Sequence, residues 1–202
     1  MNNHSKRLVR DSIKLFAAII FFWLYIPHLI LYIIGWNKDA IRSDLLRIRN
    51  QVAIGIPLPL LFLYFLHNNS YYRKVFYYRI GPIFSLLISW LRPGCSTFII
   101  PDSTKVGEGV LFAHPYSTVL NAKSIGNNFK CIHCITIGKK GEKRPVIGDN
   151  VTIGCNVCVI GDVHIGNNVT IGAGSVVVKD IPDNAVVVGN PARIIKYNNA
   201  NN

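Results

Sequence analysis

Residues 146–177 read VIGDNVTIGCNVCVIGDVHIGNNVTIGAGSVV, with an isoleucine or valine at every sixth position from Ile147 onward. Glycine directly follows many of these residues, which suits a sharp backbone corner where a side chain would be crowded. A period of six fits neither a helix nor the plain alternation of a strand. Three hexads make about 18 residues, which is one triangular coil with one inward aliphatic residue on each side. The stretch therefore predicts a parallel β-helix.

The same repeat covers residues 100–181 with two breaks in phase. One extra residue lies between Phe112 and Val119, and four lie between Ile137 and Ile147. The second surplus is polar, and solenoids accommodate such insertions as loops, often on a binding face. The residues expected to point inward are Ile100, Val106, Phe112, Val119, Ile125, Cys131, Ile137, Ile147, Ile153, Val159, Ile165, Ile171 and Val177.

The first half of the 202-residue chain has a different character. Residues 1–98 carry 12 Lys and Arg against 3 Asp and Glu, whereas residues 99–202 carry 10 against 7. Ser12 to Trp36 contains one charged residue, Lys14, and is long enough to cross a bilayer as a helix, but Pro27 interrupts it. Basic residues flank both ends, which places both on the cytoplasmic side. This charge pattern favours a re-entrant form or a second crossing over a single kinked span.

Two further apolar segments, Val52 to Leu66 and Ile80 to Leu91, are too short to span and are expected to be interfacial or buried helices. The run between them, Tyr71 to Arg79, mixes aromatic and basic residues as headgroup-level segments do. These features predict attachment to an anionic membrane surface on the cytoplasmic side. A buried helical domain in a soluble oligomer is the alternative. No recognition motif accompanies the basic residues, so no nucleic-acid partner is expected.

The spacing of four of the cysteines suggests a zinc site. Cys131 and Cys134, followed by Cys155 and Cys158, have the spacing of a zinc ribbon. The hexad phase argues against it, because the four thiols occupy four different positions after the inward residue. An odd total of five cysteines in a cytoplasmic setting also argues against a structural disulfide. We expect the cysteines to fill space in or near the core, with no metal site.

One column of residues has the composition of a catalytic site. Grouping three hexads per coil places Phe112, Cys131, Ile153 and Ile171 on one side of successive coils. The residues two positions later should then stack along one edge, about 4.8 Å apart. These residues are His114, His133, Cys155 and Ala173.

Two motifs are more specific than the hexads: IGAGSVV at 171–177 with KDIP at 179–182, and GNPAR at 189–193. With them, the chain from about residue 98 to residue 196 resembles the left-handed β-helix hexapeptide acyltransferases. Within that family it is similar to the serine acetyltransferases and related surface-polysaccharide O-acetyltransferases. The resemblance implies a homotrimer that binds acetyl-CoA in the grooves between neighbouring prisms. The matching cofactor-binding positions are Cys155, Ala173, Val178, Lys179, Arg193 and Lys196.

The chemistry of the donor agrees with these positions. A pantetheine arm needs small side chains such as Ala173, and the phosphates need cations. His114 falls where the serine acetyltransferases carry their catalytic histidine, and an imidazole suits a base that removes the proton from an acceptor hydroxyl. His133 is the second candidate, as base or as a group that binds the acceptor.

The acceptor side departs from the serine acetyltransferase pattern. Ala113 and Ile99 stand where aspartates are expected, and Arg144 stands where a histidine is expected in the loop. Lys143 and Arg144 are therefore candidate acceptor-side residues. These departures favour the same donor with a different acceptor. The expected membrane association points to a sugar or a lipid-linked glycan as that acceptor.

The sequence thus predicts three segments: a helical membrane-associated region (1–98), a left-handed β-helix acetyltransferase domain (99–196) and a disordered tail (197–202). The first functional hypothesis is an acetyl-CoA-dependent O-acetyltransferase acting on a sugar hydroxyl in surface or capsular polysaccharide biosynthesis. The second is a serine O-acetyltransferase of cysteine biosynthesis. The third is a non-catalytic β-helix scaffold.

Overall fold

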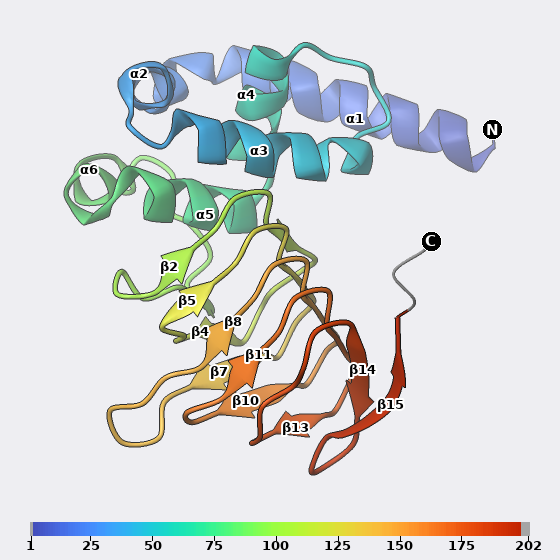
Figure 1. Ribbon diagram of the computed structural model, residues 1–202. Helices are drawn as coiled ribbons and strands as arrows, with labels where there is room; N and C mark the ends of the chain where they lie inside the picture. Colours follow the sequence, from blue (N-terminus) through green and yellow to red (C-terminus); the bar gives the residue numbers. More distant parts are fainter. Residues whose placement is uncertain (1, 199–202) are drawn as a thin grey trace. The chain divides into compact units, whose positions relative to one another are not determined.

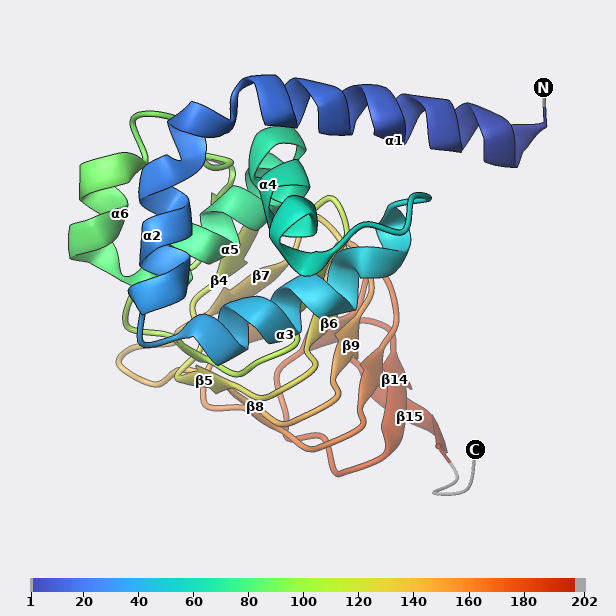
Figure 2. The same cartoon turned by 90° about the horizontal axis from the view of Figure 1, so that it is seen from above.

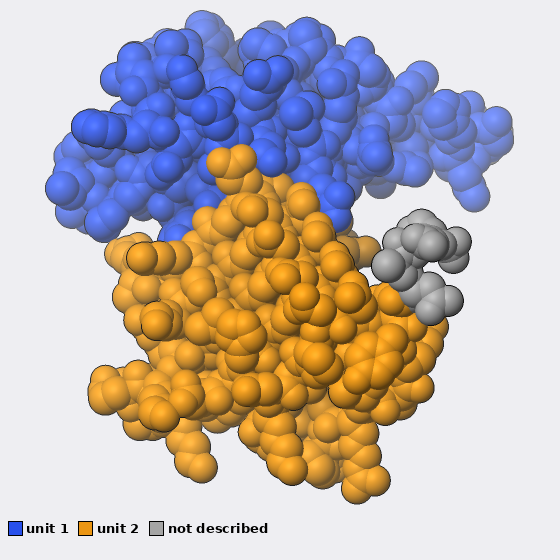
Figure 3. Space-filling view, in the orientation of Figure 1, with its two compact units in different colours: residues 1–95 blue, residues 96–202 orange. Residues whose placement is uncertain are grey.

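A computed structural model of the protein describes residues 2–198 (Figure 1). The chain divides into two compact units, residues 1–95 and residues 96–202 (Figure 3). The first unit is helical, and the second is built from short strands. An N-terminal α-helical region followed by a β-helix is the fold class that the sequence predicts.

The second unit is a left-handed parallel β-helix of about five coils. Its three sheets have the strand orders β1-β4-β7-β10-β13, β2-β5-β8-β11 and β3-β6-β9-β12-β14-β15. The strands are β1 Phe98–Ile99, β2 Lys105–Val106, β3 Leu111–Phe112, β4 Thr118–Leu120, β5 Ser124–Ile125, β6 Lys130–Cys131, β7 Thr136–Gly138, β8 Val146–Ile147, β9 Thr152–Ile153, β10 Cys158–Ile160, β11 His164–Ile165, β12 Thr170–Ile171, β13 Val176–Val177, β14 Ala185–Val188 and β15 Arg193–Tyr197.

Each coil turns three corners, which we number by the sheets they join. The first corner leads from the first sheet to the second, the second corner from the second sheet to the third, and the third corner back to the first sheet. Paired strands keep the hexad residues in register along each side. Ile153, for example, pairs with Cys131 on one neighbouring coil and with Ile171 on the other, and all three are buried. This ladder forms the core.

The predicted inward residue is wrong at one position. Leu120, not Val119, pairs with Ile137 and is fully buried, while Val119 is only half-buried. Thr118 is buried with Leu120, and its hydroxyl is satisfied because it donates to the Tyr116 carbonyl at 3.2 Å. The preceding corner therefore takes up two extra residues instead of one, and the next side of the coil is one residue shorter.

Asparagines recur at the second corner because the backbone there is left-handed. Asn128, Asn150, Asn168 and Asn184 all have φ between 55° and 62°. Asparagine tolerates this conformation better than most residues. Their side-chain amides also bond from coil to coil at 3.0–3.1 Å. The result is a polar ladder on the outside of the prism that runs parallel to the aliphatic ladder inside.

The second corner leaves no room for a side chain at Gly126. A Cβ there would lie 2.6 Å from the carbonyl carbon of Gly148 on the next coil. We expect Gly126→Ala to lower the free energy of unfolding by about 1–3 kcal/mol, the usual range for overpacking. Gly138→Ala is the matched control and should cost less, since its nearest atom would be the flexible end of Ile160. Urea denaturation followed by circular dichroism compares the two variants, and equal losses would contradict the prediction.

The last described segment caps the β-helix. β15 pairs antiparallel with β14, whereas every other pairing between named strands is parallel in the described part of the chain. Tyr197, which the sequence analysis assigns to the disordered tail, is the last residue of β15. Residues 199–202 of that predicted tail lie outside the described residues.

The first unit contains short helices with two 3₁₀ segments (Figure 2). They are α1 Asn3–Ile20, η1 Phe22–Tyr25, α2 Ile26–Ile34, α3 Lys38–Ile48, η2 Arg49–Gln51, α4 Leu58–Asn68, α5 Ser70–Ile80 and α6 Pro82–Ile88. α4 and α5 supply most of the core: all residues from Leu61 to Leu66 are buried, and Phe62 packs edge-on against Phe76 at 5.3 Å.

The predicted apolar segment from Ser12 to Trp36 is not one helix. α1 ends at Ile20, and α2 begins at Ile26 with Pro27 in its first turn, where proline is compatible with the helix. The axes of the two parts differ by 73°. No single helix within residues 2–198 is long and apolar enough to cross a membrane, although this bent pair meets the length and composition criteria together.

The basic and aromatic run from Tyr71 to Arg79 does not lie at a surface. It forms most of α5, and six of its nine residues are buried. Arg79 reaches Asp44 of α3 through two hydrogen bonds, of 2.9 Å from Nε and 3.3 Å from a terminal nitrogen. Arg73 donates to the carbonyls of Leu66 and His67 at the end of α4. The sequence predicts a headgroup-level segment here, but internal carbonyl and carboxylate acceptors satisfy both arginines.

Candidate functional site

The candidate site is built on the third corner of the β-helix. His133, Cys155 and Ala173 each stand two residues after a buried third-sheet residue, in successive coils. The backbone locks them in register: the Asn156 amide donates to the His133 carbonyl at 3.2 Å, and the Gly174 amide donates to the Cys155 carbonyl at 2.9 Å. Three of the four residues of the predicted column therefore stack.

Tyr116, not His114, occupies the fourth place in this column. The Cys134 amide donates to the Tyr116 carbonyl at 3.0 Å, which continues the same ladder by one coil. The rings of Tyr116 and His133 stack with centroids 4.7 Å apart and planes 10° from parallel. The sequence phase missed this residue because Leu120 lies eight positions after Phe112, whereas their partners on the next coil, Ile137 and Cys131, are six positions apart. The break in phase after Phe112 was the available signal.

His114 lies two residues before Tyr116 in the enlarged corner and is exposed. Its φ of 53° is left-handed, and its carbonyl accepts the Tyr116 amide at 2.7 Å. The residue before it is anchored, because the Ala113 amide donates to the Cys131 carbonyl at 3.0 Å. A non-glycine residue in this conformation is uncommon and marks a constrained turn. The turn presents an imidazole to solvent at the edge of the column.

His133 is more enclosed than His114. Its ring is half-buried under Tyr116, and its Nδ1 is shielded from solvent without a hydrogen-bond partner in the described chain. Nε2 is then the ring nitrogen available to a ligand. The two histidines thus differ in environment: one is exposed on a strained turn, and the other is held by stacking.

The cysteines around this corner differ in their accessibility. Cys131 is fully buried, and burial raises the pKa of its thiol, so it is an inert part of the core. Cys155 is half-buried in the column. No group of three or more His, Cys, Asp or Glu side chains within residues 2–198 has the geometry to hold a metal ion.

The residues assigned to acetyl-CoA do not all meet at this corner. Cys155 and Ala173 lie on it, and the turn before Arg193 continues it, since the Val176 amide donates to the Gly189 carbonyl and the Ala192 amide to the Val176 carbonyl. Lys196 is further along β15 and pairs with Val186. Val178 and Lys179 follow β13 and therefore stand on the first corner, both exposed. Within one chain, these two residues belong to a different edge of the prism.

The acceptor-side loop also leaves from the first corner. Residues 139–145 join β7 to β8, and the loop is tied to its neighbours on both sides. Lys143 forms an ion pair with Asp162 at 2.6 Å, and Arg144 donates to the Ser103 hydroxyl at 2.9 Å. The hydrogen bond and the negative charge of Asp162 raise the pKa of the Lys143 ammonium. Lys143 and Arg144 are thus held on the first corner and not beside the histidines of their own chain.

Comparison with known proteins finds a family model and several relatives that are similar to the β-helix unit. Residues 144–179 match the model of the family described as "Bacterial transferase hexapeptide (six repeats)". The chain is 43% identical over 101 residues to serine acetyltransferase 1, chloroplastic, of Arabidopsis thaliana, covering 48% of this chain and 32% of that protein. It is 42% identical over 99 residues to the putative colanic acid biosynthesis acetyltransferase WcaB of Escherichia coli, covering 47% and 61%.

Solved structures extend the likeness beyond the repeats. The Neisseria gonorrhoeae serine acetyltransferase superposes with a TM-score of 0.65 at 28% identity, covering 79% of this chain and 66% of that one. The chain spans about a third of the plant relative and about three fifths of the bacterial one. Residues 144–179 thus carry the hexapeptide repeat of bacterial transferases, and the fold of the chain is similar to that of a solved serine acetyltransferase.

Proposed function

We propose that the chain is an acetyl-CoA-dependent O-acetyltransferase that acetylates a sugar hydroxyl during surface or capsular polysaccharide biosynthesis. The names of the relatives, serine acetyltransferases and WcaB, support the acetyl transfer. The observation that carries the choice of acceptor is the distribution of carboxylates around the β-helix.

The corner that holds the histidines bears no carboxylate in residues 96–198. The acidic residues stand on the first corner (Asp102, Glu142, Asp162, Asp180) and on the second (Glu108, Asp149, Asp183). Serine carries an ammonium group, and an amino-acid site normally pairs that charge with a carboxylate. Ala113 instead gives His114 an apolar neighbour along the chain, and Ile99 lies on β1, paired with Val119. Within one chain, a neutral hydroxyl of a sugar fits this corner better than an amino acid does.

The proposed reaction needs one proton relay and no covalent enzyme intermediate. His114 takes the proton of the acceptor hydroxyl as that oxygen attacks the thioester carbonyl of acetyl-CoA. The tetrahedral intermediate collapses, the carbon–sulfur bond breaks, and the proton passes from His114 to the departing thiolate. The acetyl ester and CoA are the products. His133, the enclosed histidine, would bind the acceptor or serve as the second base.

The donor would lie along the small residues of the third corner. Cys155 and Ala173 leave room for a pantetheine arm, and Arg193 and Lys196 offer cations for its phosphates. Val178 and Lys179 stand on another edge, so they would serve the same site only if a second copy of the chain brought its first corner alongside. This requirement supports the proposed homotrimer, since a closed ring places unlike edges of neighbouring copies together.

A serine O-acetyltransferase is the second candidate, because most of the relatives described carry that name. Release of CoA from acetyl-CoA separates the candidates when it is measured with L-serine, with nucleotide sugars and with a lipid-linked glycan. We expect release with a sugar acceptor at least tenfold faster than with L-serine. Turnover on serine alone would establish the second candidate. No release with any acceptor would leave a non-catalytic scaffold.

A further inference from the structure

The helical unit exposes an apolar stripe along α1. Val9, Ile13, Phe16 and Ile20 follow the i, i+4, i+7, i+11 spacing of one helix face, and Phe16 is 66% exposed. The opposite face carries the buried residues Asp11 and Ala18 and packs on the unit. The helix is therefore anchored along one side and leaves large apolar side chains in solvent along the other.

The exposed apolar surface continues beyond α1. Phe21, Phe22 and Trp23 at the bend are each more than 40% exposed, and Ile26, Ile30 and Ile33 form a second stripe on α2. At the same end of the unit as α2 (Figures 1 and 2), α6 exposes Ile83, Leu86 and Leu87, with Leu86 at 78%, and Trp90 is exposed just after the helix. Exposed apolar side chains in these numbers, on elements that follow or adjoin one another, are typical of an interaction site. We call the exposed side chains of α1, η1, α2 and α6 the apolar face.

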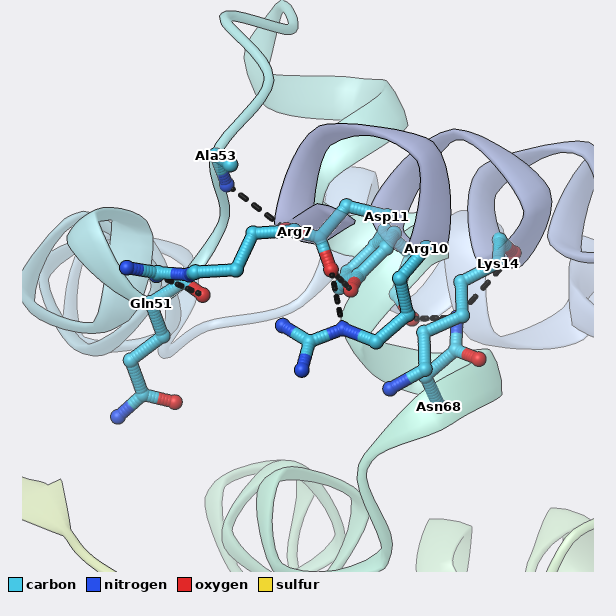
Figure 4. Close-up of polar contacts among 8 residues, drawn as sticks. Arg7, Arg10, Asp11, Lys14, Gln51, Ala53 and Asn68 are labelled. Carbon is cyan, nitrogen blue, oxygen red and sulfur yellow. Dashed lines mark hydrogen bonds and ion pairs between the residues drawn. The ribbon is translucent and has the colours of Figure 1, made fainter. Parts of the chain in front are cut away.

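The exposed charged side chains of this unit are almost all basic, because two of its three acids are buried. Asp11 is buried: it accepts from the Ala53 amide at 2.9 Å, from Tyr64 at 3.1 Å and from Arg10 at 3.2 Å (Figure 4). Asp44 is buried against Arg79. Asp39 is then the one acid in residues 2–95 with an exposed side chain.

Exposed cations stand close to the apolar face in the sequence. Lys6, Arg7 and Arg10 lie at the start of α1, and Lys38 and Arg42 lie at the start of α3, just after Trp36. A surface that combines exposed aromatic and aliphatic side chains with cations binds the interface of a bilayer containing anionic lipids. A nucleic-acid partner that matched the charge would leave the aliphatic stripes in solvent.

We propose that the helical unit lies on an anionic lipid bilayer, with the apolar face inserted at the headgroup boundary and the flanking cations on lipid phosphates. The mode is interfacial, since the apolar residues lie along the sides of bent, short helices and the opposite side of α1 packs on protein. This inference is independent of the proposed function, because it concerns the helical unit and requires no turnover.

Co-sedimentation of the full chain with vesicles tests the proposal. We expect binding to vesicles of phosphatidylcholine with 30% phosphatidylserine, weaker binding to phosphatidylcholine alone, and release by salt. The double variant Ile13→Ser/Phe16→Ser should bind about tenfold or more weakly, since two inserted side chains are lost. Leu46→Ser is the matched control: Leu46 is 45% exposed on α3, outside the apolar face, and its replacement should leave binding unchanged.

A second pair of variants, one test and one control, measures how much the cations contribute to vesicle binding. Lys6→Gln/Lys38→Gln should weaken binding to anionic vesicles about tenfold or more, at roughly fivefold per cation. Lys105→Gln/Lys123→Gln removes the same charge from the β-helix and should have little effect. The proposal is overturned if the wild type does not bind vesicles and Ile13→Ser/Phe16→Ser lowers the mass of the oligomer in solution. A second copy of the chain would then cover the apolar face. Equal binding by the variants and the wild type would also overturn the proposal.

Discussion

His114→Asn is expected to reduce kcat for acetyl transfer by about 10²–10⁴-fold, the range associated with loss of a general base. Asparagine is the appropriate replacement because His114 has a φ of 53°, and asparagine adopts this left-handed conformation with little strain. The turn that presents the side chain is thereby kept, while the group that takes the proton is removed. CoA release under saturating acetyl-CoA measures the effect.

A matched control distinguishes chemistry from a general disturbance of the β-helix. His164 is also an exposed histidine of the second unit, but it lies on β11 in the second sheet, away from the third corner. His164→Asn should leave kcat within about twofold of the wild type. If His114→Asn keeps full activity while His133→Asn loses it, the base is the enclosed histidine stacked on Tyr116. If both keep it, the third corner is not the catalytic site.

The six-residue repeat predicted the β-helix because the contacts of its core are local in sequence. Each inward residue stacks on the one about 18 positions away, so the period of the repeat also identifies the neighbours of each residue. The phase failed only at the enlarged corner of residues 113–117. Adding one residue there in the count puts Val119 inside, but the buried Thr118 can satisfy its hydroxyl on Tyr116, and this selects Leu120. The two extra residues of this corner also place Tyr116 in the column, two positions after His114, where the sequence count expects the histidine. The backbone conformation of this turn therefore determines which residue points into the core and which residue joins the column.

The helical unit was less predictable because its hydrophobicity has no fixed relation to burial. The apolar segment at residues 12–36 is largely exposed, whereas the charged and aromatic run at residues 71–79 is largely buried. Composition does not show whether Arg73 donates to a lipid phosphate or, as in the structure, to a backbone carbonyl near the end of α4. Nor can it show that Asp44, 35 residues before Arg79, supplies the buried counterion. These are tertiary contacts between helices, and no short period encodes them.

Asp44→Ala is expected to lower the free energy of unfolding of the helical unit by about 3–5 kcal/mol. The Asp44 and Arg79 side chains are only 3% and 5% exposed, and the two hydrogen bonds between them join α3 to α5. Removing the carboxylate leaves a guanidinium in the interior without its charged partner, which costs more than the bond itself contributes. All three tryptophans lie in this unit, so their fluorescence in urea reports its unfolding specifically.

Two further variants identify the cause of that loss. Asp39→Ala changes the same residue type in the first turn of the same helix, where the side chain is exposed, and should cost less than about 1 kcal/mol. Asp44→Leu/Arg79→Met replaces both charges with apolar side chains of similar size and should recover most of the lost stability, since no buried charge is left stranded. If the double variant is as unstable as Asp44→Ala, the loss comes from packing at the junction of α3 and α5 and not from the uncompensated charge.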